Sequence, residues 1–421
     1  MSGSGQSGTG GTGSAVAGPI QPSNNILNPF TPQQLQTNNT GSQLLRGAAS
    51  QAGVRSGTRF EQLAQSVSFV PVYGQASVVN LTPVPVGLIT KYLIEVICTV
   101  TNPDAGTSMS RTGFGAWNML SNITYTDPSQ NQRVNTYGFH LACVAAMRRR
   151  RVPGSAITTD SPSGFGSVVQ PITAPSTIAN NNTPVVVRAI FELPLSTGRN
   201  STKGAVVGGT VFSNQQLQIT FNPNFCQNST DGMLAGYTGA SNANPPTFSV
   251  TVNLWQHYWD QYSQGLLNLI APDLSYIYEL KSTLFTPLVA NVNNFFRYQP
   301  LREYWSTILS FDNGGVENAG TDINNFMLQA ANQTTFWTRT PSIQAFVQRN
   351  AFGDDPPAGT YFFDTHDTPI ITAAEGNTLL MMNPSSLGAG PPTPYVIVSW
   401  EDIGIASVLA AAPSLAGTGG S

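Results

Sequence analysis

The side chains best suited to acid–base chemistry near neutral pH are the three histidines of this chain, His140, His257 and His366, because imidazole titrates in that range. Apolar or aromatic residues flank the first two. A histidine in such surroundings more often packs in a core than catalyses a reaction. His140 and His257 are therefore interpreted as packing residues.

His366 has neighbours of the kind that a metal site needs. It stands in the segment Asp364-Thr-His366-Asp367, with Asp354-Asp355 upstream. Alternation along a strand would place Asp364 and His366 on one face, as two ligands of one ion require. No spacing supplies a third ligand, and a solvated loop explains the same residues. We expect no cofactor, and a metal ion near Asp364 and His366 stays an open alternative.

The one concentrated charge is a run of four arginines, Arg148, Arg149, Arg150 and Arg151. Such a run could meet anionic lipid headgroups or genome phosphates, each arginine near a membrane surface contributing about 1 kcal/mol. The alternative is a solvated loop, or a contact with carboxylates of a neighbouring subunit. The run also follows a predicted helix, whose C-terminal end attracts positive charge.

Catalytic motifs do not appear in the chain. The sequence contains no phosphate-binding loop, no GxSxG nucleophile turn and no HExxH zinc helix, so phosphate, ester and peptide chemistry each lack their usual residues. We therefore expect a protein that is not an enzyme and that has no small-molecule substrate.

Composition favours a β-rich protein that works through contacts with other subunits. Of 421 residues only 9% are charged, while 40 are glycine and 30 are proline. Gly, Pro, Asn and Ser belong to turns between short strands, and a weakly charged surface has little repulsion to keep subunits apart. The net charge of −3 argues against a specific nucleic-acid partner, which needs a basic face.

Three cysteines, Cys98, Cys143 and Cys226, are odd in number and widely spaced. They are interpreted as buried free thiols, which suits assembly in the reducing cytoplasm of a host cell. No charged and apolar leader opens the chain, so secretion is not expected. The apolar tail from Ile405 to Ala412 is shorter than the ~20 residues that span a bilayer.

Short apolar and β-branched runs bounded by Pro, Gly and Asn begin near Phe60, and each predicts a strand. Their spacing is typical of a sandwich or jelly roll. Residues 1–57 are rich in Gly, Ser, Gln and Asn, and are predicted to form a flexible N-terminal arm. The main predicted strands are Val67 to Val72, Tyr92 to Val100, Leu120 to Thr126, Pro184 to Leu193, Gln216 to Phe221, Phe248 to Leu254, Ser306 to Phe311, Tyr361 to Phe363 and Tyr395 to Trp400.

A repeated pattern predicts two copies of one β fold. Two helical candidates, 137–148 and 322–331, each follow a strand, an aspartate and a turn. The second pattern follows the first by 185 residues, both from Asp127 to Asp312 and from Thr136 to Thr321. Tandem copies would explain this offset, and the join is expected near 260–272.

A set of motifs runs in order from about Phe60 to about Pro384, and the most specific is the segment Phe311-Asp-Asn-Gly-Gly-Val-Glu-Asn-Ala-Gly-Thr-Asp-Ile-Asn324. These motifs resemble the major capsid proteins of tectiviruses, and that segment looks like a hairpin of the family's second jelly roll. Its Asn313-Gly314 pair is explained by the positive φ of a tight turn. The longer N-terminal arm and the arginine run depart from the family pattern. The other matching segments are Asp127 to Arg133, Gly138 to His140, Thr159 to Pro162, Ala174 to Ile178 and Asp273 to Tyr278.

The resemblance implies an all-β chain with two tandem jelly-roll sandwiches and short helices in loops. We expect an arm at 1–57, jelly rolls at 58–262 and 263–404, and a flexible C-terminal tail at 405–421. It further implies homotrimeric, pseudo-hexagonal capsomers that contact one another and tile an icosahedral virion around an internal membrane. Vertex and minor capsid proteins, and the membrane reached through the termini, are the expected partners.

Two other classes of protein remain as alternatives at this point. A carbohydrate-binding β-sandwich, such as a viral spike or lectin, would use the aromatic residues and polar loops at a surface groove. A jelly-roll enzyme would need a bound metal ion. The collinear capsid motifs favour the coat protein over both.

Overall fold

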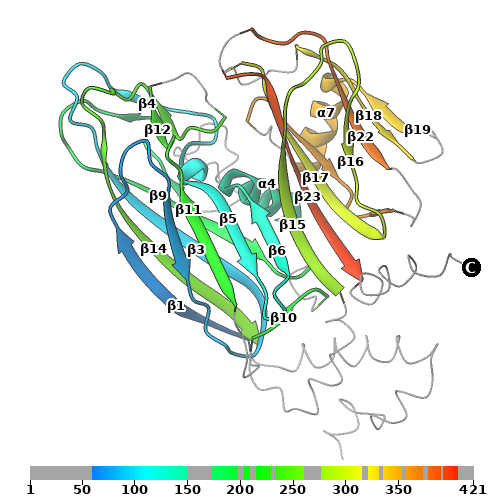
Figure 1. Cartoon of the computed structure of the whole chain (residues 1–421), viewed down its shortest axis with the longest axis horizontal. Coiled ribbons are helices and arrows are strands. Elements are labelled where there is room, and N and C mark those ends of the chain that lie inside the picture. Colours follow the sequence, from blue (N-terminus) through cyan, green and yellow to red (C-terminus); the bar gives the residue numbers. More distant parts are fainter. Residues whose placement is uncertain are drawn as a thin grey trace, which may run out of the picture.

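The computed structural model describes residues 59–149, 172–197, 203–208, 215–228, 233–259, 276–314, 321–330, 335–352, 357–372, 378–389 and 392–405. These residues form two β-sandwiches that lie side by side, coloured blue to green and yellow to red in Figure 1. Among the described residues, no helix combines the length and apolarity that crossing a bilayer takes. The arm predicted at 1–57, the tail beyond 405 and the join near 260–272 lie outside the described residues.

The first sheet of the first sandwich is antiparallel throughout. Its strand order is β1-β14-β3-β9-β7, and β10 also pairs with β3. Inward residues of β9 alternate with outward ones, as a sheet with one face in a core requires. The strands are β1 (Arg59–Phe69), β14 (Thr247–Trp259), β3 (Leu88–Thr101), β9 (Val185–Pro194), β7 (Ile172–Thr173) and β10 (Val206–Val207).

The facing sheet has the order β2-β11-β5-β6, and a small sheet of short strands, β12-β13-β4-β8, closes one end of the sandwich. A 3-10 helix, η1 (Gly115–Met119), leads directly into β5. The facing strands are β2 (Ser77–Leu81), β11 (Gln216–Phe221), β5 (Leu120–Thr126) and β6 (Gln132–Thr136); the short ones are β12 (Cys226–Gln227), β13 (Tyr237–Thr238), β4 (Met109–Arg111) and β8 (Thr177–Ile178).

The second sandwich repeats this arrangement. One sheet has the order β15-β23-β17-β20, with β21 also on β17, and the other has the order β16-β22-β18-β19. The strands of the first are β15 (Tyr276–Phe285), β23 (Tyr395–Ile405), β17 (Arg302–Asp312), β20 (Thr360–Asp364) and β21 (Ile370–Ile371); those of the second are β16 (Asn294–Arg297), β22 (Leu379–Pro384), β18 (Ile323–Gln329) and β19 (Thr335–Arg339).

Both sandwiches are jelly rolls. When the eight main strands of each half are lettered B to I in chain order, both halves show B-I-D-G facing C-H-E-F, the arrangement of a double-sheet jelly roll. The predicted all-β tandem fold is confirmed. The predicted strands at 120–126 and 216–221 match β5 and β11 residue for residue. The prediction at 67–72 overlaps only the end of β1, which begins at Arg59 and ends at Phe69, ahead of a turn at 73–75.

Two helices of 12 residues, α4 (Gly138–Arg149) and α7 (Pro341–Phe352), each follow the F strand of their own jelly roll, β6 and β19. The helix predicted at 137–148 is therefore confirmed. The helix predicted at 322–331 is wrong: that segment is strand β18, in which Phe326 and Leu328 alternate into the core.

The two similar sequence motifs therefore do not occupy equivalent places in the two jelly rolls. Asp127 follows the E strand of the first jelly roll, whereas Asp312 ends the D strand of the second. Strands β17 and β18 lie in different sheets, so the segment between them is no hairpin. Gly314 does have the expected positive φ of 75°. The fold is duplicated, but the two similar motifs lie at the ends of different strands in its two copies.

Each jelly roll buries its own apolar core. The first core includes Tyr92, Ile123 and Phe191, and the second includes Phe326 and Val398, all fully or almost fully buried. The three cysteines are free and buried in the first half, as predicted. Burial raises the pKa of each thiol well above its usual value, so none is set up as a nucleophile.

Candidate functional site

The place where the two jelly rolls meet, called the joint below, is where helix α4, two sheets and most of the buried charge converge. Strand β6 of the first jelly roll pairs in parallel with β15 of the second, with Val134 opposite Leu280 and Asn135 opposite Lys281. The C-H-E-F sheet of the first half thereby continues into the B-I-D-G sheet of the second. Backbone hydrogen bonding therefore ties the two halves into one body.

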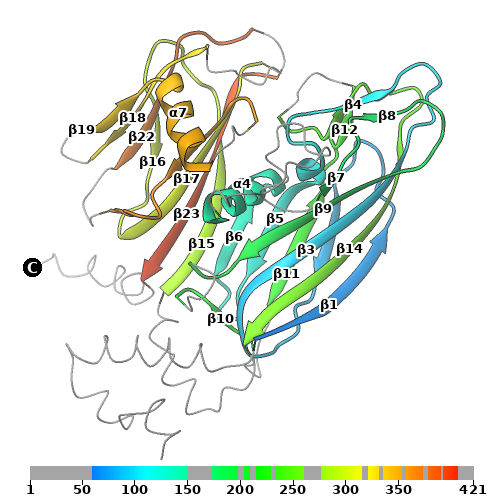
Figure 2. The ribbon, with the colours of Figure 1, turned by 180° about the vertical axis from the view of Figure 1, so that it is seen from behind.

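Helix α4 fills the joint (Figure 2). From its first residue to Met147 every residue is buried, on all sides of the helix. The helix packs on β5, β9 and η1 of its own jelly roll, and on β17 and β20 of the second. A helix that is apolar and buried all round belongs in a core, and here that core spans both halves.

His140 of α4 reaches across the joint. Its Nδ1 lies 3.0 Å from Oγ of Ser282 on β15, and its Nε2 lies 3.3 Å from Oγ of Ser310 on β17. Burial lowers the pKa of His140 to about 3, so the ring is neutral and each nitrogen is matched by a hydroxyl that can donate or accept. The interpretation of His140 as a packing residue is confirmed, with the addition that it joins the two halves.

Arg148, near the C-terminal end of α4, forms an ion pair with Glu401 of β23. Its Nη2 lies 2.5 Å and its Nε 2.8 Å from Oε1 of Glu401. The guanidinium also donates to the carbonyl of Ser196 at 2.8 Å and lies 5.0 Å from the centre of the Tyr278 ring. The structure thus assigns Arg148 a contact within the chain, in place of the lipid or subunit contact predicted for it. The side chain of Arg149, and Arg150 and Arg151, lie outside the described residues.

Glu401 is the centre of this charged group and is 1% exposed. Besides Arg148, its carboxylate accepts a hydrogen bond from Ser306 at 2.8 Å and lies 3.4 Å from Nε2 of His366. Burial alone would raise the pKa of Glu401, but Arg148 and His366 hold it well below its usual range. A buried carboxylate stays ionised only with such partners.

His366 completes the group, and its contacts bear on the metal alternative. Its Nδ1 lies 2.6 Å from Oδ1 of Asp364, so the predicted proximity of these two residues is confirmed. Burial lowers the pKa of His366, but the hydrogen bonds and charges of Asp364 and Glu401 outweigh it and raise the pKa to about 9. A protonated imidazole offers no lone pair to a metal.

In the part of the chain that the structure describes, no three His, Cys, Asp or Glu side chains are grouped so that they could hold a metal ion. His257, the third histidine, is buried and lies 3.2 Å from Glu61 on the neighbouring strand β1.

A second charged group lies one residue further along β23. Arg302 of β17 forms ion pairs with Glu279 of β15 and with Asp402, at 2.6 Å from the latter. Because two carboxylates share one guanidinium, they compete for its charge. Burial raises the pKa of Asp402 to about 7 and the charge on Glu279 adds to this, against the lowering effect of Arg302.

Both charged groups escaped detection in the sequence. Four of their members lie outside the predicted strands 306–311 and 395–400, and the structure places them within longer strands, Arg302 in β17, Glu401 and Asp402 in β23, and Glu279 in β15. The one signal in the sequence was the rarity of charged residues, which make up 9% of the chain. A charged residue in a buried strand needs a partner that offsets the cost of desolvation, so each of these residues predicts a partner elsewhere in the chain.

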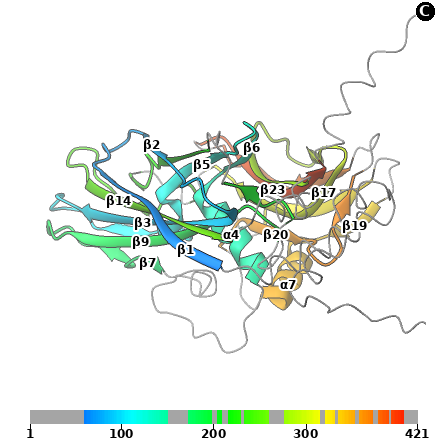
Figure 3. The same ribbon diagram turned by 90° about the horizontal axis from the view of Figure 1, so that it is seen from below.

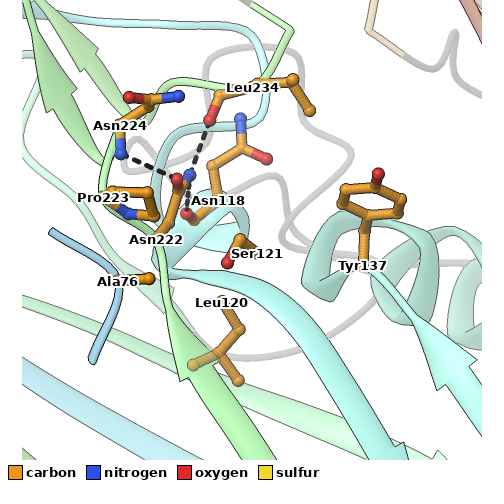
Figure 4. A pocket seen from close by; sticks show the side chains of 9 residues that line it. All are labelled: Ala76, Asn118, Leu120, Ser121, Tyr137, Asn222, Pro223, Asn224 and Leu234. Atoms are coloured by element: carbon orange, nitrogen blue, oxygen red, sulfur yellow. Dashed lines mark hydrogen bonds between the residues drawn. The ribbon is translucent and has the colours of Figure 1, made fainter. Parts of the chain in front are cut away.

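A pocket of about 170 Å³ lies where η1 meets the end of β11 (Figure 4). Asn222 organises its wall: its amide donates to the carbonyls of Asn118 and Leu234 at 2.8 and 2.6 Å, and its carbonyl accepts from the Asn224 amide at 2.9 Å. These polar groups satisfy one another. The lining contains no carboxylate, histidine, thiol or basic side chain, and it is interpreted as a loop-bracing site. The lining residues are Ala76, Asn118, Leu120, Ser121, Tyr137, Asn222, Pro223, Asn224 and Leu234.

Two jelly rolls fused through a continuous sheet and a buried helix define the class of double jelly-roll proteins. Solved structures of that class share the fold. The STIV MCP matches with a TM-score of 0.57 and 13% identity, over 85% of this chain and 99% of that chain. PBCV-1 VP54 matches with a TM-score of 0.50 and 15% identity, over 83% and 94%.

Sequence comparison specifies the family. The model described as P3 major capsid protein N-terminal matches residues 61–262, and the one described as P3 major capsid protein C-terminal matches residues 275–393. The Major capsid protein P3 of Enterobacteria phage PRD1 is 32% identical over 331 residues, which make up 77% of this chain and 83% of that protein. The chain belongs to the P3 major capsid protein family. The resemblance to tectivirus capsid proteins is confirmed, and the chain is a structural capsid protein and not an enzyme.

Proposed function

We propose that this chain builds an icosahedral virion from homotrimeric, pseudo-hexagonal capsomers that surround an internal lipid membrane. Family membership across both halves of the chain is the observation that carries the proposal. The fold supports it: each subunit contains two units with the same strand order. Three such subunits arranged in a closed ring present six similar units, which is a pseudo-hexagon.

The joint suits a subunit of this kind. A capsomer keeps its outline only if the angle between its jelly rolls is constant. Here a continuous sheet, the buried helix α4 and the Arg148–Glu401 ion pair cross between the halves. The strand pairing and the ion pair are polar and directional, so they specify one geometry as well as adding stability.

The remaining parts of the proposal concern partners and boundaries. The jelly rolls occupy 58–262 and 263–404, and the terminal segments 1–57 and 405–421 meet neighbouring subunits, the membrane or vertex and minor capsid proteins. Arg149, Arg150 and Arg151 are candidates for the same contacts with lipid or a neighbouring subunit. Assembly takes place in the host cytoplasm, without a specific nucleic-acid partner.

The oligomeric state tests the proposal directly. Light scattering of the purified full-length protein is expected to give about three times the subunit mass of 44.7 kDa, and negative-stain images of the same sample are expected to show a pseudo-hexagonal outline. A monodisperse monomer at micromolar concentration would contradict the trimer.

Removing residues 1–57 is expected to leave the trimer intact and to prevent closed shells. The segment is rich in Gly, Gln, Ser and Asn, a composition that gains order only against a partner. Light scattering measures the trimer, and electron microscopy of assembly reactions counts shells. Normal shells from the truncated chain would exclude a tying role for the arm.

A further inference from the structure

Helix α7 carries its apolar residues on the outside. Gln344 and Gln348 face inward, where they bond to each other and to the backbone of Phe362. On the opposite side Phe346 is 70% exposed and Ile343 53% exposed, beside the partly exposed Val347. Residues three and four apart share one face of a helix, so these three side chains form one apolar surface, called the α7 face below.

Comparison with α4 indicates what covers such a face. Each helix follows the F strand of its jelly roll and packs on the E and G strands of that same jelly roll: α4 on β5 and β9, α7 on β18 and β20. Figure 3 shows α4 at the joint and α7 on the same side of the chain, on the second jelly roll. The two helices are therefore equivalent parts of two equivalent units.

The difference between them lies in a second set of contacts. Helix α4 also packs on the D and G strands of the next jelly roll, β17 and β20, and its third residue, His140, bonds to Ser310 there. The third residue of α7 is Ile343, which is exposed. Within the described residues α7 has no following jelly roll, and the equivalent strands, β3 and β9, belong to a first jelly roll.

The outer side of β3 and β9 can accept an apolar face. Val186 on β9 is 47% exposed, and Ile190 on the same side is only partly covered, while Val187 and Ala189 point into the core. Arg188 stands between the two outward apolar residues, and its charge is paired with Glu95 of β3. The sheet edges are consistent with this. Strand β6, the F strand, joins β15, the B strand of the next unit. The equivalent strands β19 and β1 each lie at the end of their sheet among the described residues.

We propose that the α7 face of one subunit packs on the outer side of β3 and β9 of a second copy of this chain, and so repeats between subunits the contact that α4 makes within one. The inference rests on the proposed trimer. The two surfaces are unlike, so each subunit offers one and receives the other, and the contact closes into a ring.

The test uses three single substitutions in the full-length chain. Phe346→Glu alters the α7 face, Val186→Glu alters the receiving surface, and Ile371→Glu is the control, because Ile371 on β21 is 79% exposed and belongs to neither surface. All three positions are exposed, so thermal unfolding of the monomer is expected to change little. A charge placed in a buried apolar contact is expected to weaken trimer assembly roughly 100-fold or more.

Sedimentation measured over a range of concentrations gives the outcome. Phe346→Glu and Val186→Glu are each expected to sediment as monomers where wild type and Ile371→Glu are trimers. Mixing the two variants is expected to give a dimer, since one unaltered α7 face and one unaltered receiving surface remain. If wild type is a trimer and Phe346→Glu is also a trimer of equal stability, the α7 contact is excluded while the trimer stands. If wild type is a monomer, the trimer itself fails.

Discussion

Replacing Arg148 by methionine is expected to lower the free energy of unfolding by about 3 kcal/mol, because removing one partner of a buried ion pair leaves the other charge desolvated. Glu401 is 1% exposed and would keep Ser306 and His366 as partners, neither of which has the permanent charge of arginine. Methionine retains much of the arginine stem, so packing on Tyr278 is largely preserved. The change therefore reports mainly on the charge.

Scanning calorimetry of the purified variant measures this effect, and a fall of about 5 °C in the melting temperature is expected. Arg297→Met is the matched control, since Arg297 is exposed on β16 and far from the joint in the fold. A change at an exposed position of that kind is expected to stay within about 0.5 kcal/mol. Equal melting temperatures for the two variants would show that the ion pair contributes nothing to stability.

Raising the pH from 6.5 to 10 is expected to destabilise the joint through His366. The folded pKa of about 9 exceeds the ordinary value of 6.5, so the folded state holds the proton more tightly than the unfolded state. The stabilisation is then complete below about pH 6.5 and is lost as the pH rises through 9. Its full size is about 3 kcal/mol, from the difference between the two pKa values.

His366→Gln isolates this effect, because glutamine keeps the hydrogen-bonding capacity and cannot take up a proton. Urea unfolding of the variant and the wild type at several pH values gives the difference in stability between them. That difference is expected to be largest near pH 6.5 and to shrink toward zero by pH 10. A difference that stays constant with pH would show that His366 is neutral in the fold.

Asp402 also makes the fold less stable as the pH rises, but over a lower range of pH than His366. Its folded pKa of about 7 lies above the ordinary value of 3.8, so its contribution weakens as the pH rises from about 4 to 7. Glu401 acts oppositely, since its lowered pKa means that its stabilising contribution is present above its ordinary range and is lost in acid. The charged groups of the joint together favour mildly acidic to neutral pH.

The joint explains how a weakly charged chain uses the charges that it has. Arg148, Glu401, His366, Arg302 and Asp402 all lie where two sheets and a helix meet. The Arg148–Glu401 pair crosses between the halves and specifies their arrangement, because a displacement would leave both charges without a partner. The outer faces retain apolar side chains such as Phe346 and Val186, which are suited to contact with other subunits.

Local patterns in the sequence were sufficient to locate nine of the strands. Strand β5 and strand β11 were predicted to the residue, and helix α4 to within one residue at each end, because alternation and turn residues act over a few neighbouring positions. The same locality explains the wrong helix at 322–331. Over so short a segment the side chains fit both the helical and the strand period. Only the pairing of β18 with β19 and β22 makes the segment a strand.

The sequence by itself determined the fold class, the tandem arrangement, the free buried cysteines and the family, since each depends on composition, local periodicity or collinear motifs. Only the tertiary structure decided what meets at the joint and which face of α7 is left open. Arg148 and Glu401 are separated by 253 positions, and α4 and α7 follow the same strand in each unit yet differ in burial. Periodicity shows that a face is buried, whereas its partner is chosen by how the sheets pack in three dimensions.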